Sequence, residues 1–420
     1  MTPFAIVALI LVLGRVTTEL WLSQLNQRHV RAHAREVPPA FRGIIDEAAY
    51  RHSVDYTLAK SRFEDLTDVF NAAVLIALLF SGILPWAFAK FGATFGTSTW
   101  AMAGFLFLIG IALSISTLPF DWYAQFKLEQ RFGFNTTTIK TWVLDRVKGF
   151  LLAVFLGYPL LALLLKLIEW AGTNWWIWAT AVVVAFQFLL LLIAPAVIMP
   201  LFNRFTALPE GALRERLFAL ARRTRFPTRS IDVMDGSKRS RHSNAFFTGL
   251  GRFRRIVLFD TLITQLTDLE LEAVLAHEIG HYKKRHILKM LSVSVAGVFL
   301  AFAAIAWLAR QQWFYHAFGF QNQPGFTAAN VAPAMLLFAL LAGTITFWVS
   351  PLIHGWSRRF EYEADLFARE AMGEPQSLIQ ALRKLSEKNL SNLTPHSLYS
   401  AFYYSHPTLL ERERAVQTTA

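Results

Sequence analysis

Residues 175–201 have the sequence WWIWATAVVVAFQFLLLLIAPAVIMPL, in which no side chain is charged. A helix needs about 20 consecutive apolar residues to cross the hydrocarbon core of a bilayer. The run therefore predicts a membrane-spanning helix. Pro195 and Pro200 lie near its end. We expect a kink there, because a proline in a helix removes a backbone hydrogen bond.

Six more apolar runs approach or exceed this length. They lie at about 3–24, 67–91, 99–120, 147–168, 289–308 and 333–355. Of the 420 residues, 54% are hydrophobic and only 17% are charged, a composition that excludes an ordinary soluble domain. We therefore predict a mainly α-helical, polytopic membrane protein with about seven transmembrane helices.

Basic residues are distributed unevenly between the loops. Segments 25–66, 121–146, 202–288 and 356–420 contain 7, 4, 16 and 8 Lys and Arg residues, whereas segments 92–98, 169–174 and 309–332 contain 0, 0 and 1. Cytoplasmic loops carry an excess of basic residues, so the rich segments are predicted to face the cytosol, with the N-terminus outside. The net charge of +12 then indicates contact with anionic lipid and no binding of nucleic acid.

The spans and loops divide the chain into four parts. These are five transmembrane helices in 1–201 with cytosolic loops at 25–66 and 121–146, a cytosolic insert at 202–288, two transmembrane helices in 289–355, and a cytosolic tail at 356–420. The insert and the tail lie on the same side of the membrane, so they can form one domain. Cysteine is absent, which excludes disulfides, cysteine-ligated metals and thiol nucleophiles.

The insert contains three short strand-like runs before a helix. The runs at 230–234, 243–248 and 254–260 predict a small antiparallel sheet. The helix begins at Thr267-Asp268-Leu269-Glu270, which has the form of a capping box. In this motif the Thr267 hydroxyl accepts from the Glu270 amide, and the Glu270 carboxylate accepts from the Thr267 amide.

This helix continues into His277-Glu278-Ile279-Gly280-His281, an H-E-x-x-H pattern. His277 and His281 lie one turn apart on one face, so both imidazoles can bind one Zn²⁺. Glu278 can lie beside the ion and take a proton from the attacking water. Gly280 would let another segment approach closely. The alternative is a pair of surface histidines on an ordinary helix.

A catalytic zinc site usually has a third protein ligand, which must come from the same side of the membrane. The start of the tail contains Glu361, Glu363 and Asp365. Glu361 and Asp365 share one helix face, whereas Glu363 points elsewhere. One of the pair can ligate zinc while the other holds a ligand imidazole, and the spacing leaves both assignments open. A solvated face paired with Arg358 and Arg359 is the alternative.

Further stretches accompany the H-E-x-x-H helix and the segment from Glu361 to Asp365. They are 129–135 (EQRFGFN), 199–203 (MPLFN), 242–249 (HSNAFFTG), 255–262 (RIVLFDTL) and 404–412 (YSHPTLLER). Together they resemble the integral-membrane type I CAAX prenyl proteases, in the order of that family and over most of the chain. The resemblance is weaker in the N-terminal third.

The resemblance implies seven helices around a large, water-filled chamber within the membrane. A zincin-like α/β metalloprotease domain, built from the insert and the tail, would place one Zn²⁺ per chain at the cytosolic end. Within this domain the resemblance implies that Glu361 is the third zinc ligand and that Asp365 supports a ligand imidazole.

The resemblance also implies a substrate-binding region. It places Asn244 and Ala245 on an edge strand along which a peptide extends, and exposed strand edges do bind peptides through backbone hydrogen bonds. It places His406 and Arg412 near the substrate, where His406 could donate to the developing oxyanion. From the residues alone, a turn asparagine, a structural histidine and a surface arginine are the alternatives.

We therefore predict a membrane zinc metalloendopeptidase that resembles enzymes cleaving prenylated CAAX-type C-terminal peptides, with a peptide and the lipid bilayer as its partners. A quality-control protease without a prenyl requirement is one alternative, and a non-catalytic zinc scaffold or receptor is another. His286 and His354 are expected to have no role as ligands, because of their helix face and interfacial position. A bacterial inner membrane is favoured over the endoplasmic reticulum, and nothing in the sequence indicates an oligomeric state.

Overall fold

The computed structural model describes residues 1–248, 254–321 and 325–418. Most of the described chain is helical, which confirms the mainly α prediction. The helices are α1 (Pro3–His33), α2 (Glu47–Phe80), α3 (Ile83–Phe95), α4 (Thr99–Tyr123), α5 (Ile139–Leu152), α6 (Tyr158–Ala171), α7 (Trp175–Ile193), α8 (Met199–Phe202), α9 (Ala212–Arg223), α10 (Asp260–Gln265), α11 (Asp268–Lys283), α12 (His286–Leu308), α13 (Gln312–Ala317), α14 (Ala328–Met372), α15 (Gln376–Lys388), α16 (Ser397–Tyr403) and α17 (Leu409–Thr418).

Short irregular helices and four strands complete the described structure. The 3₁₀ helices are η1 (Pro39–Phe41), η4 (Gly172–Asn174) and η6 (Gly236–Lys238), and the π-helices are η2 (Ala124–Glu129), η3 (Ala153–Gly157) and η5 (Ala194–Ile198). The strands are β1 (Phe205–Ala207), β2 (Ser230–Met234), β3 (Ala245–Thr248) and β4 (Arg255–Phe259).

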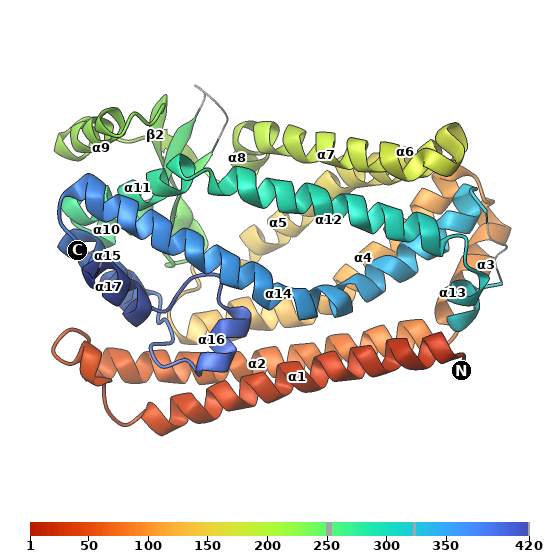
Figure 1. Cartoon of the computed structure of the whole chain (residues 1–420), viewed down its shortest axis with the longest axis horizontal. Helices are drawn as coiled ribbons and strands as arrows, with labels where there is room; N and C mark the ends of the chain where they lie inside the picture. Colours follow the sequence, from red (N-terminus) through yellow and green to blue (C-terminus); the bar gives the residue numbers. More distant parts are fainter. Residues whose placement is uncertain (249–253, 322–324, 419–420) are drawn as a thin grey trace.

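The long helices run along one another, and the smaller elements collect at one end of the molecule (Figure 1). Helices α1 and α2 form a side-by-side pair, and α12 packs against both α7 and α14. Helices α9, α10, α11, α15 and α17 lie with the sheet at the end away from the N-terminus (Figure 1). The insert and the tail therefore meet at one end of the helix bundle.

The apolar stretches confirm a multi-pass membrane protein. Five helical stretches in the described chain are long and apolar enough to cross a membrane, and α2 with α3 forms a bent candidate for a sixth. The stretch at 139–202 spans 64 residues and contains two of the seven predicted runs. Within it α6 packs against α7, so the stretch folds back on itself. The count of seven stays a prediction.

The run at 67–91 is not one continuous helix. Helix α2 ends at Phe80, and α3 starts at Ile83 after a bend of 59°. Gly82 adopts a φ of 80°, a left-handed conformation that a helix cannot continue through and that glycine adopts without strain. Where a kink was predicted near Pro195, the helix passes through the π-helix η5 before α8.

The sheet is mixed, so the prediction of an antiparallel sheet is wrong. Its order is β1-β2-β4-β3, in which β2 and β4 are parallel and the other two pairs are antiparallel. Strand β3 lies outside β4 and pairs antiparallel with it, so β4 is the neighbour of β2 and runs in the same direction as β2. Strand β1 was missed because three residues are too short for a periodic pattern. Strand β3 forms one edge of the described sheet.

One hydrophobic core joins the insert to the tail. It includes Leu217 of α9, Leu258 of β4, Leu275 of α11, Ile379 of α15 and Val416 of α17, each no more than 1% exposed. Because these side chains come from both segments, insert and tail share one core. This core fixes α11 against α14, the two helices that carry the predicted metal ligands.

Candidate metal centre

Helix α11 begins at the predicted capping box, which the structure confirms. The Glu270 amide donates to the Thr267 hydroxyl at 3.4 Å, and the Thr267 amide donates to Glu270 Oε2 at 2.8 Å. These two bonds satisfy amides that a helix N-terminus otherwise leaves unpaired. The cap fixes the start of α11, and with it the direction in which His277 and His281 project.

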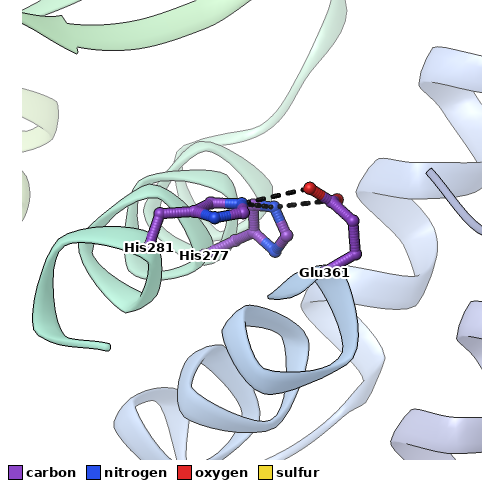
Figure 2. Close-up of side chains that lie close together, drawn as sticks. All are labelled: His277, His281 and Glu361. Carbon is purple, nitrogen blue, oxygen red and sulfur yellow. Dashed lines mark hydrogen bonds and ion pairs between the residues drawn. The ribbon is translucent and has the colours of Figure 1, made fainter. Parts of the chain in front are cut away.

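His277, His281 and Glu361 converge on one point between α11 and α14 (Figure 2). The two Nε2 atoms lie 3.1 Å apart. Glu361 reaches them with Oε2 at 3.5 Å from His277 Nε2 and Oε1 at 3.3 Å from His281 Nε2. The three residues offer ligand atoms within 4.8 Å of one another, which is the arrangement of a possible metal site.

Gly280 explains how α14 comes so close to α11. A Cβ atom at this position would lie 2.9 Å from Ala364 Cα and 3.0 Å from Ala364 O. These contacts are shorter than ordinary van der Waals distances, so a larger residue would separate the helices. The predicted role of Gly280 in close approach is confirmed.

The outer nitrogens of both histidines are occupied. His277 Nδ1 lies 2.8 Å from Asp365 Oδ1, and His281 Nδ1 lies 2.9 Å from His286 Nδ1. If each Nδ1 carries the proton, both Nε2 atoms direct a lone pair at the same point. Glu361 Oε2 is buried and makes no hydrogen bond within the described chain. Two facing lone pairs and a buried carboxylate oxygen without a hydrogen bond fit a cation, and imidazole with carboxylate suits zinc.

Asp365 is held in turn by Arg412. The Arg412 side chain is only 12% exposed, and its Nε donates to Asp365 Oδ2 at 2.7 Å. A second bond runs from Arg412 Nη2 to Asp365 Oδ1, and Arg412 Nη1 lies 3.7 Å from Glu361 Oε2. The family resemblance implied that Arg412 lies near a substrate, whereas the residues alone favoured a surface arginine. In the structure most of its guanidinium is engaged with carboxylates beside His277.

The electrostatic environment shifts the pKa values on α11. Burial lowers the pKa of His277, but the adjacent carboxylates of Asp365 and Glu361 outweigh this effect and raise the pKa to about 9 in the metal-free protein. Burial raises the pKa of Glu278, an effect that the nearby His277 and His281 oppose. A carboxyl group with a raised pKa is better suited to exchange protons near neutral pH.

His406 and a large cavity lie beside the ligand cluster. His406 Nε2 is 3.4 Å from Glu361 Oε1, and its side chain is 64% exposed. The cavity has a volume of 1290 Å³, and its lining includes His406, Arg412, Tyr56 of α2 and Trp142 of α5. The cavity therefore extends from the cluster to α2 and α5, at positions within the predicted cytosolic segments 25–66 and 121–146. The chamber within the membrane that the family resemblance implies stays a prediction.

The predicted edge residues lie at the start of β3. Ala245 pairs with Leu258 of β4, and the Asn244 carbonyl accepts from the Phe259 amide at 3.1 Å. The Asn244 side chain turns back, with Oδ1 accepting from the Ala245 amide at 2.8 Å. These contacts put Ala245 on the edge strand β3 and Asn244 directly before it.

Sequence reasoning missed His286 and Glu363. His286 lies outside the ligand cluster, as expected, but it contacts His281 directly, and its Nε2 lies 3.0 Å from Glu363 Oε2. The only signal was its position five residues after His281, beyond a helix corner that the sequence does not reveal. His354 lies apart from the cluster, with Nδ1 at 2.7 Å from the Phe402 carbonyl.

A bundle of membrane-length helices, with an H-E-x-x-H helix facing a buried glutamate, defines a membrane-embedded metallopeptidase. A family model described as "CAAX prenyl protease N-terminal, five membrane helices" matches residues 26–204, and the model of peptidase family M48 matches residues 207–420. The chain belongs to peptidase family M48, among its integral-membrane CAAX prenyl proteases.

Similar proteins match along nearly the whole chain. CAAX prenyl protease 1 of Saccharomyces cerevisiae is 39% identical, with 91% of this chain and 88% of the relative covered. The human CAAX prenyl protease 1 homolog is 31% identical, with 96% and 93% covered. The crystal structure of S. mikatae Ste24p is 34% identical, with 99% of both chains covered and a TM-score of 0.91. These relatives are eukaryotic and lend no support to a bacterial membrane.

Proposed function

We propose that this protein is a zinc metalloendopeptidase that cleaves prenylated CAAX-type C-terminal peptides. One observation carries the metal assignment: His277 Nε2, His281 Nε2 and Glu361 Oε2, a buried oxygen without a hydrogen bond in the described chain, converge at one point. The printed names of the relatives supply the substrate class.

We assign His277, His281 and Glu361 as the ligands of one Zn²⁺ per chain. Three protein ligands leave a position free, as a catalytic site needs, whereas a structural site closes with four. The zinc, when bound, supplies a Lewis acid that polarises the scissile carbonyl and makes water easier to deprotonate. Asp365 holds His277 through Nδ1, which keeps Nε2 available for the metal.

Glu278 is the proposed proton carrier. It lies on α11 between the two histidine ligands in sequence, and burial raises its pKa. Its carboxylate accepts a proton from the attacking water and later donates it to the leaving amine. A structural zinc site needs no such base, so Glu278 favours an enzyme over a non-catalytic scaffold.

The substrate is proposed to extend along β3 and into the cavity. Asn244 and Ala245 stand where a peptide would add as a further strand through backbone hydrogen bonds. His406 is exposed and lies 3.4 Å from Glu361, so its imidazole can donate to the oxyanion that forms on the scissile carbonyl. Arg412 borders the same region, because its Nη1 lies 3.7 Å from Glu361 Oε2.

The active site is proposed to face the cytosol. The insert and the tail that build it contain 16 and 8 Lys and Arg residues within 202–288 and 356–420. Basic residues concentrate on the cytosolic side of membrane proteins. Protease digestion of sealed vesicles of both orientations tests this proposal, since only vesicles with their cytosolic face outward should expose the tail.

The function is tested with a labelled, prenylated CAAX-type peptide and its unprenylated twin. Purified protein and its Glu278→Gln variant are compared at equal zinc content. We expect the wild type to cleave the prenylated peptide faster and the variant to cleave neither. Equal cleavage of both peptides would instead support a quality-control protease. If zinc-loaded wild type cleaved neither peptide, the proposed substrate class would be wrong.

A further inference from the structure

A sharp corner between α11 and α12 brings a third histidine to the metal ligands. Arg285 connects the two helices with a φ of 58°, the left-handed region that non-glycine residues rarely adopt. His286 follows as the first residue of α12 and is only 3% exposed. The strained corner turns the chain so that His286 Nδ1 meets His281 Nδ1 at 2.9 Å.

His286 is held in this position from two sides. Its ring stacks on Phe360 with centroids 4.2 Å apart and an interplanar angle of 9°. Its Nε2 lies 3.0 Å from Glu363 Oε2, and Lys289 Nζ lies 3.8 Å from the same oxygen. The stacking fixes the ring plane and the carboxylate fixes its rotation, so His286 has one orientation.

Hydrogen-bond chemistry then sets the direction of each bond. An ionised carboxylate only accepts, so His286 Nε2 donates to Glu363. A neutral imidazole has one N–H, so His286 Nδ1 must accept, and His281 Nδ1 must be the donor. His281 Nε2 is thereby left with its lone pair, 3.3 Å from Glu361 Oε1.

Helix α14 thus supplies a different carboxylate to support each histidine ligand. Asp365 contacts His277 Nδ1 directly, at 2.8 Å. Glu363 lies on another face of α14 and reaches His281 only through His286. The two successive hydrogen bonds that link Glu363 to His286 and His286 to His281 correspond to the single contact between Asp365 and His277. Such partners orient a ligand imidazole and increase its basicity.

We infer that His286 and Glu363 are positioning residues that fix His281 in the tautomer and orientation required to bind zinc. This inference rests on the proposed function, because it takes His281 to be a zinc ligand. The contacts of both residues are with other side chains, and we assign neither of them to the substrate or the reacting atoms. Their removal should therefore weaken zinc binding while the KM of the zinc-saturated enzyme stays the same.

The test measures zinc affinity and zinc dissociation rate in the purified full-length protein, by competition with a chelator. In His286→Phe the ring still stacks on Phe360 but cannot accept a hydrogen bond. In His286→Asn an oxygen replaces Nδ1 at the same distance along the side chain, so an acceptor remains. His354→Asn is the matched control. His354 lies in α14 but apart from the ligand cluster, and its Nδ1 contacts the Phe402 carbonyl.

We expect zinc affinity to fall about 10- to 100-fold in His286→Phe, with a faster zinc release. Glu363→Ala should show a smaller loss, His286→Asn should recover most of the affinity, and His354→Asn should match the wild type. Equal losses in His286→Phe and His286→Asn would show that the restored hydrogen-bond acceptor does not support zinc binding, and unchanged affinity in His286→Phe would also overturn the inference.

A His281→Ala variant separates this inference from the proposed function. If His281→Ala bound zinc as tightly as wild type, the ligand assignment itself would be wrong. If His281→Ala lost zinc while His286→Phe kept it, the ligand assignment would stand and the positioning role would fail.

Discussion

Arg412 and Asp365 are joined across 47 residues of sequence by a two-pronged contact, with Nε donating to Oδ2 at 2.7 Å and Nη2 to Oδ1. Asp365 is 1% exposed and also contacts His277 Nδ1 at 2.8 Å. Arg412 therefore acts on the predicted metal site through Asp365. It ties the last helix of the tail, α17, to the centre of the site.

The first prediction concerns this pair. Arg412→Gln removes the cation and leaves the buried Asp365 charge without its partner, which costs about 3–5 kcal/mol in comparable sites. We expect a lower midpoint of thermal unfolding and weaker zinc binding, because Asp365 no longer holds His277 in place. Arg414→Gln, on an exposed position two residues further on, is the control. Equal midpoints for both variants would contradict the structural role of Arg412.

A second prediction follows from the approach of α11 to α14. Gly280→Ala places a methyl group 2.9 Å from Ala364 Cα, so the helices must separate. We expect a loss of about 1–3 kcal/mol in stability from this overpacking. Zinc affinity should fall too, because Glu361 moves away from the histidines. Gly297→Ala is the control, since nothing lies within 4 Å of its added Cβ. Normal zinc binding by Gly280→Ala would show that the close approach of α11 to α14 is not needed for zinc binding.

A third prediction concerns competition between zinc and protons. The pKa of His277 in the metal-free protein is about 9, above its ordinary value of 6.5. Protonated His277 therefore stabilises the metal-free fold fully below pH 6.5, and this contribution is lost as the pH rises through 9. Zinc requires the neutral imidazole, so binding near neutral pH should release a proton from His277.

This competition is measured by calorimetry in buffers of different ionisation enthalpy. His277 alone should make zinc affinity rise about tenfold for each pH unit up to its pKa. The heat of binding should vary with the buffer. A heat of zinc binding that is the same in every buffer at pH 7 would mean that His277 is already neutral there. That result would contradict the raised pKa of His277.

The local parts of the site could be predicted from sequence, whereas contacts between distant segments could not. The capping box at Thr267 and the spacing of His277 and His281 depend on neighbours within one helix, and the structure confirms the predicted cap. The partners of Arg412 depend on how α17 packs against α14. The role of His286 depends on a left-handed corner at Arg285, a conformation that no residue pattern there indicates.

In the fold, too, local features could be predicted from sequence and contacts between distant segments could not. Apolar runs indicated a multi-pass membrane protein, because the length of a run depends only on the run itself, while the count of seven helices stays a prediction. The direction of β4 was mispredicted, since it depends on β3 lying outside it rather than between β2 and β4. The break at Gly82 was missed because a glycine among apolar residues is also compatible with a continuous helix.

The most direct test of the central claim is the zinc content of the purified protein and two variants, measured together with peptide cleavage. The wild type should contain one zinc per chain and cleave the prenylated peptide. Glu361→Ala should lose both zinc and cleavage, and Glu278→Gln should keep zinc but lose cleavage. A wild type without zinc, or a Glu361→Ala variant that keeps zinc and cleavage, would contradict the account.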